Sequence, residues 1–162
     1  MTTPLRLLLT AVCALAATSS AFAQVGGNFS AGPPVDLSLE ISSGPHGPQV
    51  SPSEVELISG EYYRLNVTSD ADLDWRLEVD ELLRNSHLRL VTIAGIEVHL
   101  QGLAFRAIEF DVPGQAQFSL VPIRTGTFEF SVSDVPSTVR RRSEEAGRPV
   151  EPRRVAGQFV VR

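Results

Sequence analysis

The stretch from Ile108 to Ser133 constrains the fold of this chain more than any other part of the sequence. Two segments within it, 118–122 and 128–132, alternate apolar and polar residues, and the turn-forming run Arg124–Thr125–Gly126 lies between them. Alternation with a period of two, bounded by glycine and proline, is typical of half-buried antiparallel strands joined by tight turns. The sequence therefore predicts two neighbouring strands that each turn one face toward a core.

Runs of the same kind recur along most of the chain, which indicates an all-β protein. We expect further strands at 35–41, 55–57, 62–68, 75–79, 88–92, 96–100, 105–110 and 157–161. The segment 80–85 begins with acidic residues and ends with Arg and Asn, the charge order of a single helical turn. The segment 42–53, rich in Pro and Gly, is expected to be a loop. About eight strands and one short helical turn predict a Greek-key β-sandwich.

The beginning of the chain has the features of an export signal. Arg6 precedes an apolar run at 7–17 that is too short to span a bilayer, and Ala21–Phe22–Ala23 forms a cleavage site of the small-x-small type. We therefore expect a signal peptide at 1–23, a flexible leader at 24–34 and one domain at 35–162. The mature protein should be periplasmic or secreted, with no integral membrane segment after cleavage.

Composition excludes several kinds of chemistry in the mature protein. The single Cys and the single Met are Cys13 and Met1, both within the signal peptide, so the mature chain offers no disulfide, thiolate ligand or thiol nucleophile. All 14 basic residues are Arg, and 13 of them remain against 19 acidic residues once Arg6 is removed, a net charge of −6. This balance disfavours nucleic-acid binding. No G-x-S-x-G motif occurs and no nucleophile is paired with a base, so we expect a protein that is not an enzyme.

Several segments together resemble a known family. They are Gly60 to Leu65, Pro113–Gly114, the run from Phe118 to Phe130, and a terminal Gly-x-Phe-Val-Val at 157–161. In this order and spacing they are similar to periplasmic cupredoxin-like proteins, whose fold is that of plastocyanin and azurin. The resemblance covers roughly 35–162 and implies a cupredoxin-type Greek-key sandwich.

The resemblance also implies where a copper ion would be held. Cupredoxins bind it with two imidazoles, a thiolate and a weak axial thioether. The thiolate counterpart here falls at Val132 or a neighbour, the first imidazole near Asp74–Trp75, and the remaining two ligands between Ser133 and Gly157. This sequence has no Cys, His or Met at any of these places. We therefore expect a scaffold that lacks the type 1 copper ligands, and no cofactor.

Three histidines remain as candidates for a different metal site. His46 is expected to be exposed in a loop. Glu97 and His99 should share one face of a strand because side chains alternate, and His87 could fold against them. His87, Glu97 and His99 are thus weak candidates for binding copper or another divalent metal with nitrogen and oxygen ligands. An ordinary solvated face with an ion-pairing His explains the same pattern.

An arginine-rich stretch takes the place of the ligand-bearing loop of the family. We expect 133–156 to be one long loop without strand pattern, and such loops are either functional or disordered. Its candidate partner-binding residues are Arg140, Arg141, Arg142, Arg153 and Arg154. They could contact an acidic partner, a phosphate or a lipid headgroup. A solvated loop neutralised by interspersed glutamates is the other interpretation.

Two functional hypotheses follow from these observations. The first is an exported, non-enzymatic binding or accessory module that contacts another periplasmic or exported protein through the arginine stretch or the Glu97–His99 face. The alternative is a divergent metal-binding or electron-transfer protein that uses nitrogen and oxygen ligands.

Overall fold

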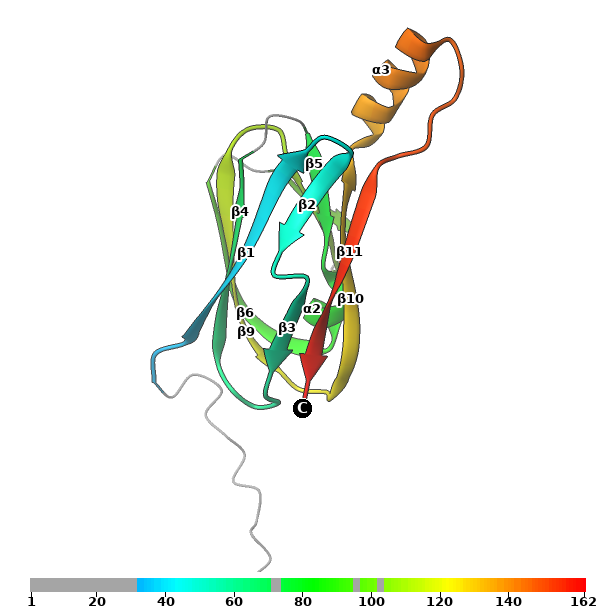
Figure 1. The fold of residues 1–162 in the computed structure, drawn as a ribbon. Coiled ribbons are helices and arrows are strands. Elements are labelled where there is room, and N and C mark those ends of the chain that lie inside the picture. The colour runs from blue at the N-terminus through cyan, green and yellow to red at the C-terminus, as the bar shows by residue number, and fades with distance from the viewer. Residues whose placement is uncertain (1–31, 71–73, 95–96, 102–103) are drawn as a thin grey trace, which may run out of the picture.

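The protein is a β-sandwich of two twisted sheets packed face to face (Figure 1). The computed structural model describes residues 32–162 except 71–73, 95–96 and 102–103, and for 97–101 and 104 it describes the backbone alone. Along the five-stranded sheet the order is β2 (Gly47–Ser51), β1 (Val35–Gly44), β4 (Tyr63–Ser69), β9 (Gly114–Pro122) and β6 (Ser86–Ala94). Along the six-stranded sheet it is β3 (Glu54–Leu57), β11 (Arg154–Val161), β10 (Gly126–Asp134), β5 (Trp75–Glu78), β8 (Ala104–Phe110) and β7 (Glu97–Gln101).

The chain passes repeatedly from one sheet to the other. It crosses at every step from β2 to β7, and again between β8 and β9 and between β9 and β10. Most neighbouring strands are antiparallel, but β1 runs parallel to β4 and β11 runs parallel to β3. The β2–β3 and β6–β7 crossings join edge strands of the two sheets, one pair on each side of the sandwich, in keeping with a Greek-key arrangement.

The space between the sheets is filled by the apolar positions of the alternating runs. The largest aromatic side chains in it, each at most 1% exposed, are Trp75, Phe110, Phe118, Phe130 and Phe159. The rings of Phe130 and Phe159 lie 4.9 Å apart across the β10–β11 pair, and Phe105 meets Phe118 edge-on at 5.4 Å between the sheets. Such aromatic pairs add about 0.5–1.5 kcal/mol to the free energy that comes from burying their area.

The predicted sandwich is confirmed, with differences in its elements. The described residues form eleven strands rather than about eight. The predicted helical turn is α2 (Asp80–Arg84), which buries Leu82 and Leu83. The expected loop at 42–53 is instead mostly a hairpin, in which β1 and β2 pair from Gly44↔Gly47 to Glu40↔Ser51. Its Gly and Pro residues mark a two-residue turn, and the chain returns to a strand directly after it.

The prediction of one long loop at 133–156 is wrong. Residues Pro136–Ala146 form the helix α3, and the flanking residues belong to β10 and β11. The helix was missed because it has no apolar stripe, the main sequence signal of an amphipathic helix. Its two ends carry the usual signals all the same, since Pro136 occupies the first turn and Gly147 follows the last residue.

Within the described part of the chain no helix has both the length and the apolar character needed to cross a membrane.

Candidate functional site at the base of a helical arm

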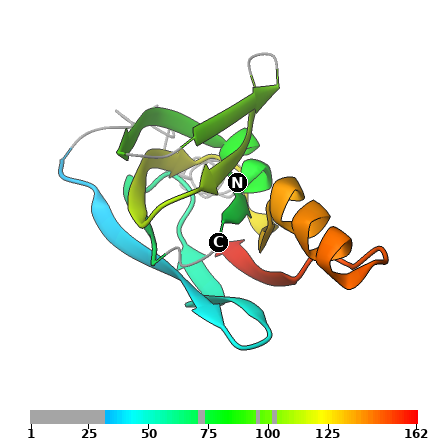
Figure 2. The ribbon, with the colours of Figure 1, turned by 90° about the horizontal axis from the view of Figure 1, so that it is seen from above.

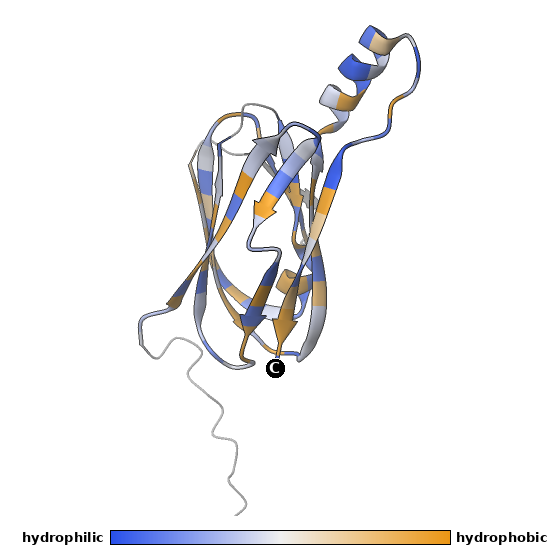
Figure 3. Ribbon diagram, in the orientation of Figure 1, coloured by the Kyte–Doolittle hydropathy of each residue, from blue (hydrophilic) through white to orange (hydrophobic). Residues whose placement is uncertain are grey.

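The most distinctive part of the molecule is a helical arm that projects from one end of the sandwich. It consists of α3 and the return segment 147–153, inserted between the paired strands β10 and β11 (Figures 1 and 2). Only Thr138 of α3 is buried. Figure 3 shows that the helix is dominated by polar residues, whereas the strands alternate. The arm is therefore held by a few specific contacts and not by an apolar interface.

The outer end of the arm is closed by backbone hydrogen bonds. Gly147 has φ of 63°, the left-handed conformation that glycine adopts at low cost after a helix. Its N–H donates to the carbonyl of Glu144, and the N–H of Arg148 donates to that of Ser143, at 3.2 Å each. The hydroxyl of Ser143 then accepts from the N–H of Val150 at 3.1 Å. These bonds reverse the chain and keep the return segment beside α3.

The inner end of the arm is fixed by a buried carboxylate. The side chain of Asp134, the last residue of β10, is 0% exposed. Arg153 donates to it from Nη2 at 2.7 Å, from Nε at 3.1 and 3.2 Å, and from its backbone N–H at 2.8 Å. Arg142 of α3 donates to the same carboxylate at 2.7 Å. Asp134 therefore joins three segments: the end of β10, the middle of α3 and the start of β11.

Two further contacts complete this arm-base cluster, which we define as Asp134, Arg142, Arg153 and Trp75. The guanidinium of Arg153 lies 5.2 Å from the centre of the Trp75 ring, within the range of a cation–π interaction. The indole N–H of Trp75 donates to the hydroxyl of Ser43 in β1 at 3.2 Å. Beside the cluster, the Thr138 hydroxyl donates to Asp74 at 3.1 Å. Each buried polar group is thereby paired, which is what makes its burial tolerable.

The electrostatics of the cluster favour the charged forms. Burial alone would raise the pKa of Asp134, but hydrogen bonds from Arg153 and the charge of Arg142 outweigh it and lower the pKa below the ordinary value of 3.8. The hydrogen bond to Asp134 raises the pKa of Arg153. The carboxylate of Asp134 and the guanidinium of Arg153 are therefore both charged at neutral pH, and their ion pair holds the base of the arm.

The cluster occupies the region to which the cupredoxin resemblance assigned the metal. In the β5–β10 pair, Asp134 lies opposite Trp75 and Val132 lies opposite Leu77, and both Val132 and Trp75 are 0% exposed. Among the described residues, no group of three or more His, Cys, Asp or Glu side chains could hold a metal ion. The positive charges beside Asp134 are the guanidinium groups of Arg142 and Arg153.

The structure divides the five candidate arginines into two groups. Arg142 and Arg153 belong to the arm-base cluster, and Arg154 pairs with Glu129 at 2.6 Å across the β10–β11 ladder. Arg140 and Arg141 are exposed on α3, and in the described part of the chain no ion pair involves them. Arg140 and Arg141 are therefore the members of the set best placed to meet another molecule.

The structure places the histidine candidates on different sheets. His87 is exposed on β6 of the five-stranded sheet, opposite Val121. Glu97 and His99 belong to β7 of the six-stranded sheet, but their side chains lie outside the described residues. Metal binding by these three residues stays a prediction. His46 is exposed in the turn between β1 and β2, as expected.

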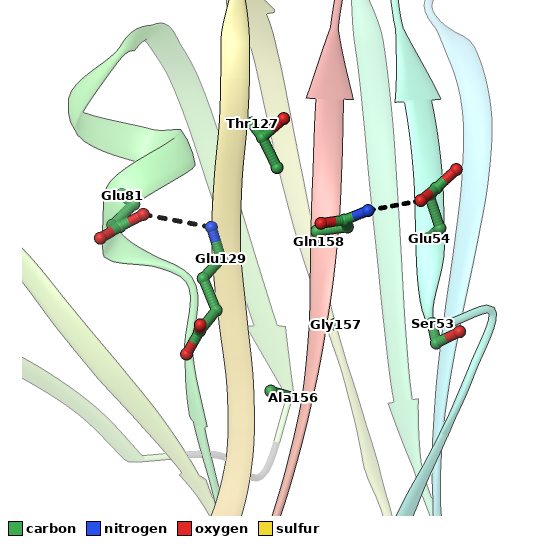
Figure 4. Close-up of a pocket in the computed structure, with 8 residues that line it drawn as sticks. All are labelled: Ser53, Glu54, Glu81, Thr127, Glu129, Ala156, Gly157 and Gln158. Carbon is green, nitrogen blue, oxygen red and sulfur yellow. Dashed lines mark hydrogen bonds between the residues drawn. The ribbon is translucent and has the colours of Figure 1, made fainter.

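A shallow pocket of about 600 Å³ lies on the outer face of the six-stranded sheet (Figure 4). Its polar groups bind one another: Gln158 donates to Glu54 at 2.5 Å, and the N–H of Glu129 donates to Glu81 at 3.1 Å. The Glu129 carboxylate is bound by Arg154. None of the residues that line it is a His, Cys or Lys. Each of its three carboxylates, those of Glu54, Glu81 and Glu129, thus accepts a hydrogen bond from another residue of the protein.

Solved structures with a similar architecture include domains of copper proteins. Fet3p, a multicopper oxidase that functions in iron import, is 10% identical with a TM-score of 0.49, and the match covers 82% of this chain and 29% of that one. Auracyanin B is 12% identical with a TM-score of 0.42, covering 81% and 91%. The cysteine protease inhibitor EhICP2 of Entamoeba histolytica is 14% identical with a TM-score of 0.37, covering 81% and 100%.

These similarities concern the architecture alone. The chain spans less than half the length of the first two multicopper oxidases that it matches, 29% and 45%. No protein-family model and no curated protein matches the sequence.

Proposed function

We propose that this protein is an exported, non-enzymatic binding module that uses the helical arm to contact another exported protein. The observation that carries the proposal is the arm-base cluster. A fully buried carboxylate with two arginine partners fixes the position of a helix that buries almost nothing of its own. Partnered buried charges are costly to assemble, and in some proteins they are retained because they specify one geometry, which is the role that we propose for them here.

The distribution of charge supports the arm as the contact surface. On the sandwich, several charged side chains pair within the molecule, as in Arg76–Glu109 at 2.5 Å and Arg162–Glu56 at 2.6 Å. On the arm, no ion pair is found in the described structure for six charged residues: Arg140, Arg141, Glu144, Glu145, Arg148 and Glu151. A surface with charges of both signs and no internal partners suits a polar contact that selects one partner by complementarity.

The partner that we propose is a protein with carboxylates positioned for Arg140 and Arg141. Guanidinium groups form bidentate bonds with carboxylates, which gives orientation as well as attraction. The contact would be salt-sensitive, because both arginines are exposed to solvent.

The proposal can be tested by cross-linking in the producing cells. A photo-reactive residue is placed at Glu144 on the arm, and a matched control is placed at Glu40, which is exposed on β1 of the sandwich. We expect one discrete adduct from position 144, none of the same mass from position 40, and loss of the adduct when Arg140→Ala and Arg141→Ala are added.

Two results would contradict the proposal. One is the same adduct from both positions, which would place the contact elsewhere or make it unspecific. The other is an adduct from position 144 that survives the double substitution, which would exclude the two arginines from recognition.

A further inference from the structure

We infer that the arm is also a modification site: an arginine-specific endoprotease nicks the folded protein within Arg140–Arg141–Arg142, and the two pieces stay together. This inference is independent of the proposed binding partner. It follows from three observations on the structure, which are the weak support of α3, the protection of the other arginines, and the pairing of the strands on either side of the arm.

The first observation is that α3 can open without opening the sandwich. Isolated helices of about 12–15 residues are marginal in water, and α3 has 11. It has no side-chain N-cap, no acidic residue in its first turn and no basic residue in its last turn. Among the described residues, the side-chain hydrogen bonds from α3 to the sandwich are Thr138 with Asp74 and Arg142 with Asp134. Breaking these two contacts and unwinding α3 would expose an extended segment of the kind that proteases bind.

The second observation is that the remaining arginines of the described domain are poor sites. Five of the other ten lie in strands, where the backbone is held by ladder hydrogen bonds. Arg84 lies in α2, which is anchored by the buried Leu82 and Leu83, and Arg153 is bound to Asp134 through both its backbone N–H and its guanidinium. Arg124 lies in the short β9–β10 turn, with its N–H bound to the carbonyl of Asn85 at 3.3 Å and its side chain bound to the Asn85 amide oxygen. The bond after Arg148 precedes Pro149, a residue without a backbone N–H, which such proteases do not accept.

The third observation concerns what remains after the cut. Hydrolysis adds one water across the peptide bond, which leaves a carboxylate on the arginine before the cut and an amine on the residue after it. The C-terminal piece still carries β11, which pairs with β10 over eight residues from Gly126↔Val161 to Ser133↔Arg154, and with β3 on its other edge. It also keeps Phe159 and Val161 in the core. The nicked protein therefore stays one particle with the sandwich intact.

The experiment is limited proteolysis of the mature protein with trypsin, which can cut this chain only after arginine because it contains no lysine. Mass spectrometry of the earliest products should show one complementary pair of fragments, the first ending at Arg140, Arg141 or Arg142. On gel filtration without denaturant the nicked protein should elute as a single species, and the fragments should separate in urea.

Matched variants relate the cut to opening of the arm. Thr138→Ala removes the bond to Asp74 without altering any cleavage site, and it should speed nicking about fivefold at unchanged fragment masses. Thr138→Ser keeps the hydroxyl and should cut at the wild-type rate. R140Q/R141Q/R142Q should abolish the early cut, although it also removes one of the two contacts of the arm. Arg124→Gln should change nothing.

The inference is overturned by any of three results. The first cut could map to the sandwich, for example after Arg124 or Arg106. Thr138→Ala could leave the rate unchanged, which would mean that these contacts do not limit access. The fragments could also separate without denaturant, which would mean that the β10–β11 ladder does not hold the pieces.

Discussion

At the scale of single residues, Asp134 makes the ion pairs that hold the arm to the end of the sandwich. Its carboxylate is fully buried and is shared by Arg142 and Arg153. Replacing Asp134 with Asn would leave two guanidinium groups close together without a counter-charge. Removing one partner of a buried ion pair costs about 3 kcal/mol or more. Asp134→Asn should therefore lower the free energy of unfolding by about that amount.

Urea denaturation followed through the fluorescence of Trp75 measures this change, since Trp75 is the only Trp and lies against Arg153. As a control, Arg154→Gln removes an exposed ion pair with Glu129 on the same strand. It should cost no more than about 1 kcal/mol. If the two substitutions lower the free energy of unfolding by the same amount, burial of Asp134 does not add to its contribution to stability.

The same carboxylate predicts the response to acid. Its pKa is below the ordinary 3.8 in the folded protein, so folding holds the ionised form. The stability that it contributes is present above about pH 4 and is lost as the pH falls toward the lowered pKa. Urea midpoints measured from pH 7 down to pH 3 should decline more in the wild type than in Asp134→Asn. Parallel declines would assign the acid sensitivity to other groups.

At the scale of elements, β11 depends on a position without a side chain. A methyl group at Gly157 would lie 2.5 Å from the carbonyl oxygen of Ser53 and closer still to the ring of Phe130. Both neighbours are held, since Phe130 is in the core and Ser53 accepts the N–H of Gln158 at 2.9 Å. Gly157→Ala should therefore destabilise the fold by about 1–3 kcal/mol, the usual cost of overpacking.

Thermal unfolding of Gly157→Ala beside Ala156→Gly tests this prediction. Ala156 is exposed on the same strand, and its loss of a methyl group should cost less than 1 kcal/mol. If the two variants melt at the same temperature, the close approach at Gly157 is not a constraint on the fold.

The elements differ in how far the sequence predicts them. The strands around Phe118 and Phe130 were predictable because burial of one face imposes a period of two. The helix α3 was not, because its positions are set by end signals and by ion pairs distant in sequence, which leave no periodic pattern. The same holds for the arm-base cluster. Asp134 and Trp75 are 59 positions apart along the chain and meet only through the β5–β10 register.

Of the candidate site, the sequence indicates only the arginine stretch. This stretch is evident from its charge. Which of its arginines bind Asp134 and which are exposed could be learned only from the structure. Arg142 and Arg140 are two positions apart in the sequence, yet one contacts Asp134 and the other is exposed. A helical turn of 100° per residue separates them onto different faces, and a stretch interpreted as a loop gives no such information.

At the scale of the whole molecule, a β-sandwich of two sheets carries a cluster of charged side chains at one end. The two sheets and their apolar core provide the stability. The arm-base cluster fixes a polar helix that projects from this end (Figure 1). In this account the fold serves as a rigid support that presents the arm to a partner.

The central claim, that the arm-base cluster holds the arm in one position, can be measured directly. Because the described residues include no cysteine, spin labels can be attached at Thr68→Cys on β4 and Ala146→Cys at the end of α3, both exposed. Pulsed electron paramagnetic resonance should give one narrow distance distribution in the otherwise unaltered protein and a broad one when Arg142→Gln is added. A broad distribution that does not change with Arg142→Gln would contradict the account.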